Sequence, residues 1–94
     1  MTYARRVDKL QGAIVRELRK SGYQVFITSG LGDGFPDLLV GSKKGTLVLF
    51  ELKSGREPLT RFEQRFHREF ASSPVHVVET ATVALGWMRH YDQI

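Results

Sequence analysis

The residues of this sequence whose types and spacing could do chemistry are two carboxylates and a lysine: Asp37, Glu51 and Lys53. Paired carboxylate oxygens are ligands that hard divalent cations prefer. A lysine ammonium beside them can place a positive charge close to a reacting oxygen. Whether the three side chains meet depends on how the segments that carry them pair.

A hairpin is predicted to bring them together. The apolar segments 35–42 and 46–53 are joined by Lys43-Lys44-Gly45, a short turn whose glycine accepts a positive φ without strain. Counting outward from this turn gives the following opposed pairs: Ser42 with Thr46, Gly41 with Leu47, Leu39 with Leu49, and Asp37 with Glu51. Lys53 projects from the same face as Glu51, because strand side chains alternate with a period of two.

The negative charges of the two opposed carboxylates must be balanced by nearby positive charge. At about 5 Å they repel by roughly 3 kcal/mol at an effective dielectric constant of 20, a large part of a small domain's stability of about 5 to 15 kcal/mol. A divalent cation, Mg²⁺ above all, would offset this repulsion. Alternatively, the pair lies at a solvent-facing strand end, where water and Lys53 screen its charges.

Hydrophobic periodicity predicts an α/β fold around this hairpin, a mixed sheet flanked by helices. A helix is expected over residues 3–21, ending at Gly22, and a strand over 23–28. Beyond the hairpin, the pattern predicts a helix at 61–71, a strand at 75–79 and a helix at 80–90. The order is therefore α-β-β-β-α-β-α.

The predicted helix at 61–71 starts with a capping box, Thr60-Arg61-Phe62-Glu63. Its Phe62, Phe66 and Phe70 lie one turn apart and are interpreted, together with Trp87, as core residues. Nucleic-acid bases could stack on these rings only if the rings were exposed, and helical spacing of this kind favours burial.

Composition limits the class of protein. With 94 residues and a net charge of +4, the chain predicts one small basic domain spanning 1–94. The absence of cysteine excludes disulfide frameworks, thiolate nucleophiles and cysteine-based metal sites. No apolar run is long enough to cross a membrane, so a soluble, intracellular protein is expected.

Two further features are interpreted structurally. Residues 30–35 match neither a dinucleotide-binding loop nor a P-loop and are read as a mobile loop leading into Asp37. The three histidines, His67, His76 and His90, lack zinc-ligand spacing and are expected to be surface or structural residues.

The motif Gly34-Phe35-Pro36-Asp37-Leu38, followed by Glu51-Leu52-Lys53, resembles the signature of the PD-(D/E)XK nucleases. With Asp8 on the first helix and Gln64 on the second, the chain resembles the VRR-NUC family, the virus-type replication-repair nucleases. The resemblance covers nearly the whole chain and implies a restriction-endonuclease-like core.

The resemblance assigns roles to individual residues. It implies that Asp37, Glu51 and the Leu52 carbonyl bind Mg²⁺, or Mn²⁺ in its place, and that Lys53 positions the attacking water. Gln64 would orient groups from the second helix. Asp8 stands where the family usually has glutamate, which leaves direct metal contact and a water-mediated or second-metal role open.

The excess of basic residues and the family resemblance both suggest DNA as the partner. A solvated helix face would also explain the charge of residues 1–22. The candidate contacts to the DNA backbone are Arg5, Arg6, Lys9, Arg16, Lys43, Lys44, Arg61, Arg65 and Arg68. Standalone domains of the family resemble phage or prophage Holliday junction resolvases that act as homodimers, in the cytoplasm of a bacterium or an infected host. The alternatives are a flap or single-strand nuclease and an inactive nucleic-acid-binding module.

Overall fold

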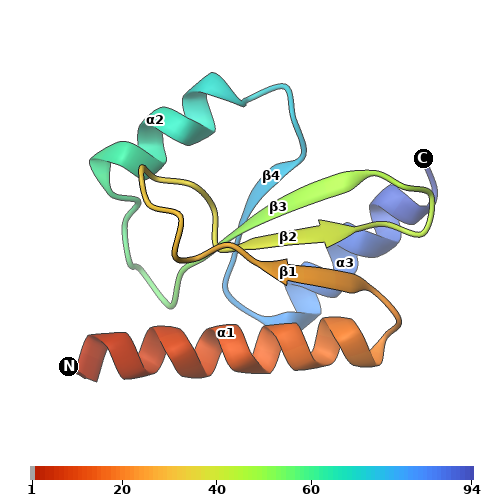
Figure 1. Cartoon of the computed structure of the whole chain (residues 1–94), viewed down its shortest axis with the longest axis horizontal. Coiled ribbons are helices and arrows are strands. Elements are labelled where there is room, and N and C mark those ends of the chain that lie inside the picture. The colour runs from red at the N-terminus through yellow and green to blue at the C-terminus, as the bar shows by residue number, and fades with distance from the viewer. Residues whose placement is uncertain (1) are drawn as a thin grey trace.

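The structure has three helices and four strands, which follow one another in the predicted order α-β-β-β-α-β-α (Figure 1). The computed structural model describes the backbone of residues 2–94 and the side chains from residue 9 onward. The elements are α1 (Thr2–Lys20), β1 (Gln24–Ile27), β2 (Leu38–Gly41), β3 (Leu47–Leu52), α2 (Arg61–Glu69), β4 (Val75–Val78) and α3 (Ala81–Asp92). Within the described residues, no helix is long and apolar enough to cross a membrane.

The strands form one mixed sheet in the order β1-β2-β3-β4. The first three strands are antiparallel, and β4 runs parallel to β3. The register of the central hairpin is as predicted, because Leu39 pairs with Leu49 and Gly41 with Leu47. Strand β2 begins one residue after Asp37, whose N–H donates to the Phe50 carbonyl at 2.9 Å.

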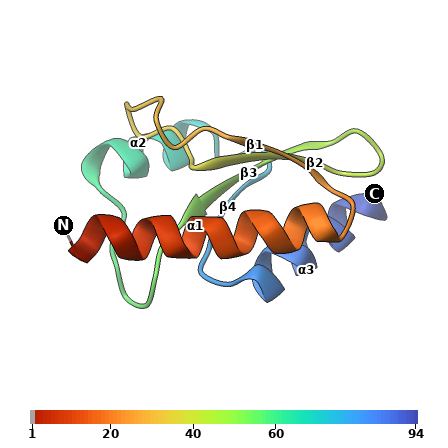
Figure 2. The same cartoon turned by 60° about the horizontal axis from the view of Figure 1, so that its bottom comes forward.

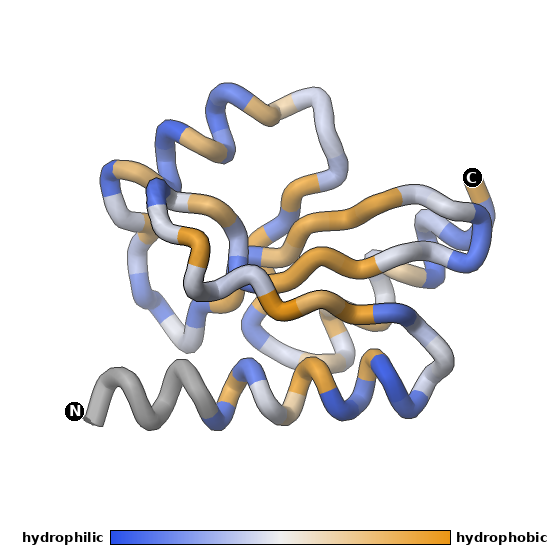
Figure 3. The backbone as a smooth tube through the Cα atoms, in the orientation of Figure 1, coloured by the Kyte–Doolittle hydropathy of each residue, from blue (hydrophilic) through white to orange (hydrophobic). Residues whose placement is uncertain are grey.

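Helices α1 and α3 cover the same face of this sheet (Figure 2). Ile14 and Leu18 of α1 and Met88 of α3 are buried against residues of the inner strands such as Val40 and Phe50. These positions alternate along the strands and recur every third or fourth residue on the helices, as an α/β core requires. Figure 3 shows the resulting hydrophobic band along the strands.

The prediction that the phenylalanines of helix α2 belong to the core is wrong. None of its nine residues is buried, and the rings of Phe62 and Phe70 are 53% and 44% exposed. The reason is the position of the helix: α1 and α3 occupy the core face, while α2 lies beyond the ends of the strands (Figures 1 and 2). Phe66 therefore packs edge-on against Phe35 of the loop between β1 and β2, at 5.2 Å between ring centroids, and not in the core.

Trp87 agrees with its prediction. It packs against the core cluster from α3, and its indole stacks on the His76 imidazole with ring centroids 3.6 Å apart. His76 in turn lies 2.6 Å from the Tyr91 hydroxyl. These contacts join β4 to α3.

Candidate active site

The candidate catalytic residues Asp37, Glu51 and Lys53 lie together in a small cavity at the carboxyl end of β3. The cavity has a volume of about 260 Å³ and is lined by Asp37, Glu51, Leu52, Lys53, Glu57, Thr60 and Glu63. The structure thus brings together the two carboxylates, the lysine and Leu52, which the sequence separates by up to sixteen positions. Helix α2 closes the cavity with its first turn.

Backbone hydrogen bonds on three sides position Asp37. Its carbonyl accepts from the Thr28 N–H at 2.8 Å, and its own N–H donates to β3. Its carboxylate Oδ2 accepts from the Leu52 N–H, also at 2.8 Å. Because neighbouring strands hold both its backbone and one carboxylate oxygen, Asp37 is a rigid element of the cavity.

Glu51 is the most strongly perturbed group of the site. The residue is 2% exposed, and Oε1 has no hydrogen-bond partner in the described part of the chain. Burial first, then hydrogen bonding to Asp37 and the charges of Asp37 and Glu63, raise the pKa of Glu51 to about 10, against an opposing effect of Lys53. The surroundings of Glu51 therefore favour its protonated form, because the positive charge nearby does not balance an ionised carboxylate.

Lys53 does not pair with the two carboxylates that the hairpin register brings together. Its Nζ lies 2.7 Å from Glu63 Oε1 and 3.5 Å from Glu57 Oε2, and the ion pair with Glu63 is largely buried. Burial opposes ionisation of Glu63, but the hydrogen bonds from Lys53 and the Thr60 N–H outweigh it, so that the pKa of Glu63 lies below its ordinary value. Glu63 thus links the capping box of α2 to the cavity.

Sequence reasoning missed Glu63 as a site residue, because its place in the capping box already explained it. The capping box itself is confirmed, since Thr60 Oγ1 accepts from the Glu63 N–H and Glu63 Oε1 accepts from the Thr60 N–H. The sequence signal that could have identified Glu63 is the capping box, because it ties the Glu63 carboxylate to the first turn of α2. A glutamate that caps the first turn of α2 must lie wherever that turn is placed.

His67 also lies at the site, one turn after Glu63. Its Nε2 is buried 3.9 Å from Glu51 Oε1, and neither atom has a hydrogen-bond partner among the described residues. Burial is the main cause that lowers the pKa of His67, so the neutral imidazole is favoured. The i, i+4 spacing from Glu63 was the available sequence signal, since such residues share one helix face.

The donor set fits a hard divalent cation. Two carboxylates, one of them buried with an unpartnered oxygen, form the core of such a site, and a cation would stabilise the ionised form of Glu51. In the described part of the chain, no three His, Cys, Asp or Glu side chains are grouped to hold a metal ion. An ion held by Asp37 and Glu51 would need further ligands, which water and, as the family resemblance implies, the Leu52 carbonyl would supply; Mg²⁺ accepts such a mixture because it retains several waters.

The structure does not place the other two predicted site residues, Gln64 and Asp8, in this cluster, for different reasons. Gln64 is exposed on α2, where its amide donates to the Leu59 carbonyl at 3.0 Å, and it does not line the cavity. The side chain of Asp8 lies outside the described residues. The roles of both remain predictions.

The basic residues predicted to contact DNA fall into separate regions. Arg61, Arg65 and Arg68 line a hollow of about 470 Å³ on α2. Lys43 and Lys44 lie in the hairpin turn, at the far end of the sheet from α2 (Figure 1). Arg5 and Arg6 lie outside the residues whose side chains are described, and Lys9 is exposed on α1.

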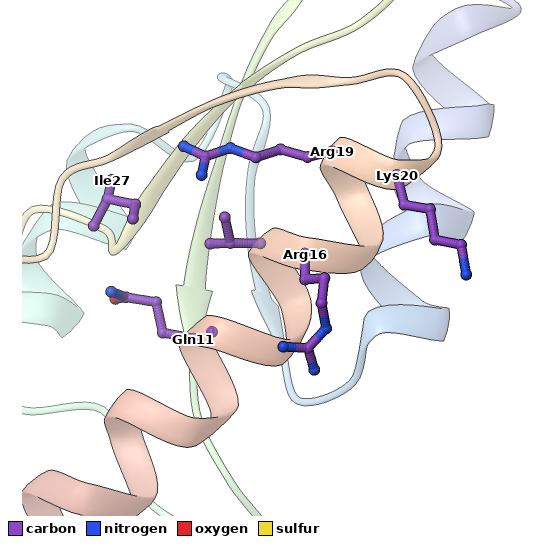
Figure 4. A pocket seen from close by; sticks show the side chains of 7 residues that line it. Gln11, Arg16, Arg19, Lys20 and Ile27 are labelled. Atoms are coloured by element: carbon purple, nitrogen blue, oxygen red, sulfur yellow. The ribbon is translucent and has the colours of Figure 1, made fainter.

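Arg16 belongs to a second, larger hollow between α1 and β1. This hollow has a volume of about 900 Å³ and is lined by Gln11, Gly12, Val15, Arg16, Arg19, Lys20 and Ile27 (Figure 4). Arg19 spans it and donates to the Val25 carbonyl at 3.1 Å, which occupies one backbone acceptor of the edge strand. The hollow has an apolar floor and basic walls, and it is separate from the carboxylate cavity.

Comparisons with known proteins support the fold. The sequence matches no protein-family model and no curated protein. A solved structure described as a VRR_NUC domain is similar to this chain, with a TM-score of 0.70 and 24% sequence identity. The match covers 89% of this chain and 95% of that one. The chain therefore has the fold of a VRR_NUC domain, which confirms the predicted α-β-β-β-α-β-α architecture.

Proposed function

We propose that this protein is a Mg²⁺-dependent endonuclease that cuts four-way DNA junctions as a homodimer. The observation that carries the proposal is the carboxylate pair of Asp37 and buried Glu51, with its unpartnered Glu51 oxygen, beside Lys53, in the fold of a VRR_NUC domain. Few structural roles explain a buried glutamate whose pKa is raised by burial and by an adjacent aspartate in so small a domain.

Each residue of the cavity has a defined task in this proposal. Asp37 and Glu51, with the Leu52 carbonyl, would hold the cation, which would lower the pKa of a water and neutralise charge on the phosphate. Lys53, held by Glu63, presents its ammonium to the developing negative charge. Thr28 and the β3 backbone keep Asp37 in place, so that the carboxylates are oriented before substrate binds.

Junction cutting and dimerisation are the finer parts of the proposal. A four-way junction has two symmetric strands to cut, which suits two active sites related by a two-fold axis. The face of the sheet opposite the core supports a dimer, because Phe26 and Leu47 there are 69% and 63% exposed. Nothing in the basic regions resembles a base-reading motif, so selectivity for DNA structure is favoured over selectivity for sequence.

The test uses labelled four-way junctions, flaps, duplex and single strands, each with and without Mg²⁺. Wild type should cut the junction symmetrically in Mg²⁺, and Asp37→Asn should lower the rate at least about 100-fold, the scale on which catalytic electrostatics acts. Asp33→Asn is the matched control, because Asp33 is exposed in the neighbouring loop and the same charge is removed.

The other outcomes distinguish the alternatives. Preferential cutting of flaps or single strands would replace the junction substrate while retaining the active site. Binding without cutting under every metal condition would favour the inactive nucleic-acid-binding module. Cutting that is equal in Asp37→Asn and wild type would overturn the assignment of the site.

A further inference from the structure

The exposed ring of Phe62 stands among arginines. Arg61, Phe62, Arg65 and Arg68 together line the hollow of about 470 Å³ on the outer side of α2. The arginines recur at i, i+4 and i+7, a spacing that places them along one stripe of the helix. Phe62 is 53% exposed beside this stripe, although a large apolar side chain is ordinarily removed from water.

The ring is also held in a defined position. The Arg65 guanidinium lies over it, 5.4 Å from the ring centroid. The backbone that carries the ring is fixed as well, because the loop packs so closely that a Cβ added to Gly34 would overlap the Phe62 carbonyl. An exposed ring on a fixed backbone, with a guanidinium already beside it, forms a stacking surface that needs little ordering when a ligand binds.

From this arrangement we infer that the outer side of α2 binds an unpaired nucleotide. The base stacks on the Phe62–Arg65 surface, and Arg61 and Arg68 bind the flanking phosphates. Stacking on an exposed aromatic ring beside arginines is how proteins hold single-stranded nucleic acid, and it requires a base that is not already stacked in a duplex. The charge of the stripe matches a phosphate backbone and disfavours a cationic or purely apolar partner.

The position of this surface gives it a use. Thr60 and Glu63, which flank Arg61 and Phe62 in sequence, line the carboxylate cavity. At 3.6 residues per turn the arginine stripe lies roughly opposite Glu63 on the helix, so an unpaired base would be held across α2 from the site proposed to cut the backbone. The inference rests on the proposed function in that it assumes a DNA substrate, and it adds that the substrate has an unpaired base that reaches the outer side of α2.

The experiment measures binding without cutting. The probe is an oligonucleotide containing 2-aminopurine, either single-stranded or in a one-base gap within a duplex, in EDTA. Wild type should quench the 2-aminopurine fluorescence, and Phe62→Leu should abolish the quenching and weaken single-strand binding by at least about 5-fold, the effect of one lost base stack. Phe62→Trp should restore both.

Phe70→Leu is the matched control. Phe70 is 44% exposed on the same face of the same helix, but it does not line the arginine hollow. The same residue change there should leave quenching and affinity unchanged. Thermal melting of each variant checks that the fold is retained.

Three results would overturn the inference. The first is equal quenching in Phe62→Leu and wild type, and the second is an equal loss of affinity for fully paired duplex and for the gapped probe. The third is a change of molecular mass caused by Phe62→Leu, which would identify the surface as a contact between protein copies. In all three cases, junction cutting by wild type would still support the proposed nuclease, whereas a protein that cuts no DNA but quenches the probe would refute only the nuclease.

Discussion

At Glu51 the effects of burial and of negative neighbours act in the same direction, since both favour the protonated carboxyl. Asp37 supplies the nearest of those charges, while its own carboxylate is held by the Leu52 N–H. An asparagine at position 37 could keep that hydrogen bond through its amide oxygen and would remove the charge. The residue that is unfavourable to the metal-free fold is therefore the one that a cation would need.

The first prediction concerns this carboxylate. In EDTA, Asp37→Asn should melt above wild type by roughly 4–8 °C, corresponding to about 1 kcal/mol for a chain of this size. Added Mg²⁺ should raise the melting temperature of wild type and have little effect on the variant, because ligand binding stabilises only a fold with an intact site. Differential scanning calorimetry checks both values, with Asp33→Asn as control. A variant that melts below wild type in EDTA would contradict the unfavourable effect of the Asp37 charge on Glu51.

The second prediction concerns the partner of Lys53. Glu63→Gln retains a side-chain oxygen for the capping box but loses the 2.7 Å ion pair. At neutral pH the variant should be less stable by about 2 kcal/mol, because a largely buried ammonium loses its nearest counterion. Urea unfolding measures the difference, and Glu69→Gln, exposed at the end of the same helix, should be neutral.

The pH dependence of this difference follows from the sign of the pKa shift. The pKa of Glu63 in the fold lies below its ordinary value of 4.5, so the fold favours the ionised form. The stabilisation is complete above pH 4.5 and is lost as the pH falls through the lowered pKa. The gap between wild type and Glu63→Gln should accordingly close on acidification, and a gap that widens would contradict the ion pair.

At the scale of elements, the geometry of the site depends on helix α2. The helix carries Glu63 to the cavity and His67 to within 3.9 Å of Glu51, yet it buries no residue in the core. What holds it is local: the capping box at its start, the contact of Phe66 with Phe35, and the close approach of Gly34 to Phe62.

The third prediction tests that close approach. Gly32 and Gly34 have nearly the same backbone, with φ of +79° and +77°, but a Cβ at position 32 would meet nothing within 4 Å. Both alanine variants should pay the cost of a positive φ, about 1 kcal/mol, and Gly34→Ala should lose roughly a further 1–3 kcal/mol through the overlap with Phe62. Chemical unfolding of the two variants gives the difference directly, and equal stabilities would show that α2 does not rest on the loop.

At the scale of the whole molecule, the face of the sheet opposite α1 and α3 is open. The register aligns Phe26, Leu39, Leu49 and Val75 in one row across the four strands, with Leu47 beside it. A hollow of about 350 Å³ next to this row is lined by Gln24, Val25, Phe26, Leu39, Gly41, Ser42 and Leu47. So much exposed apolar surface in a small domain is typical of an interface.

The fourth prediction assigns this surface to the proposed dimer. Leu47→Glu should convert the dimer to a monomer, because it would place a charge inside an apolar contact. Leu31→Glu, at a similarly exposed leucine in the loop between β1 and β2, should leave the mass unchanged. Sedimentation equilibrium measures the mass. A wild-type monomer would contradict dimerisation, and a dimer that survives Leu47→Glu would place the interface elsewhere.

The sequence alone determined those features that depend on residues close together along the chain. The hairpin register followed from the turn at Gly45, and the capping box from Thr60 and Glu63, because backbone geometry and short-range hydrogen bonds decide both. The order of helices and strands followed in the same way from hydrophobic periodicity.

Only the tertiary structure decided where α2 lies. The spacing of Phe62, Phe66 and Phe70 specifies a helix face but not what covers it, and the core face of the sheet was already taken by α1 and α3. For the same reason the partner of Lys53 is Glu63, and His67 faces Glu51. Contacts between elements far apart in sequence depend on packing, and packing is a property of the whole fold that no local pattern contains.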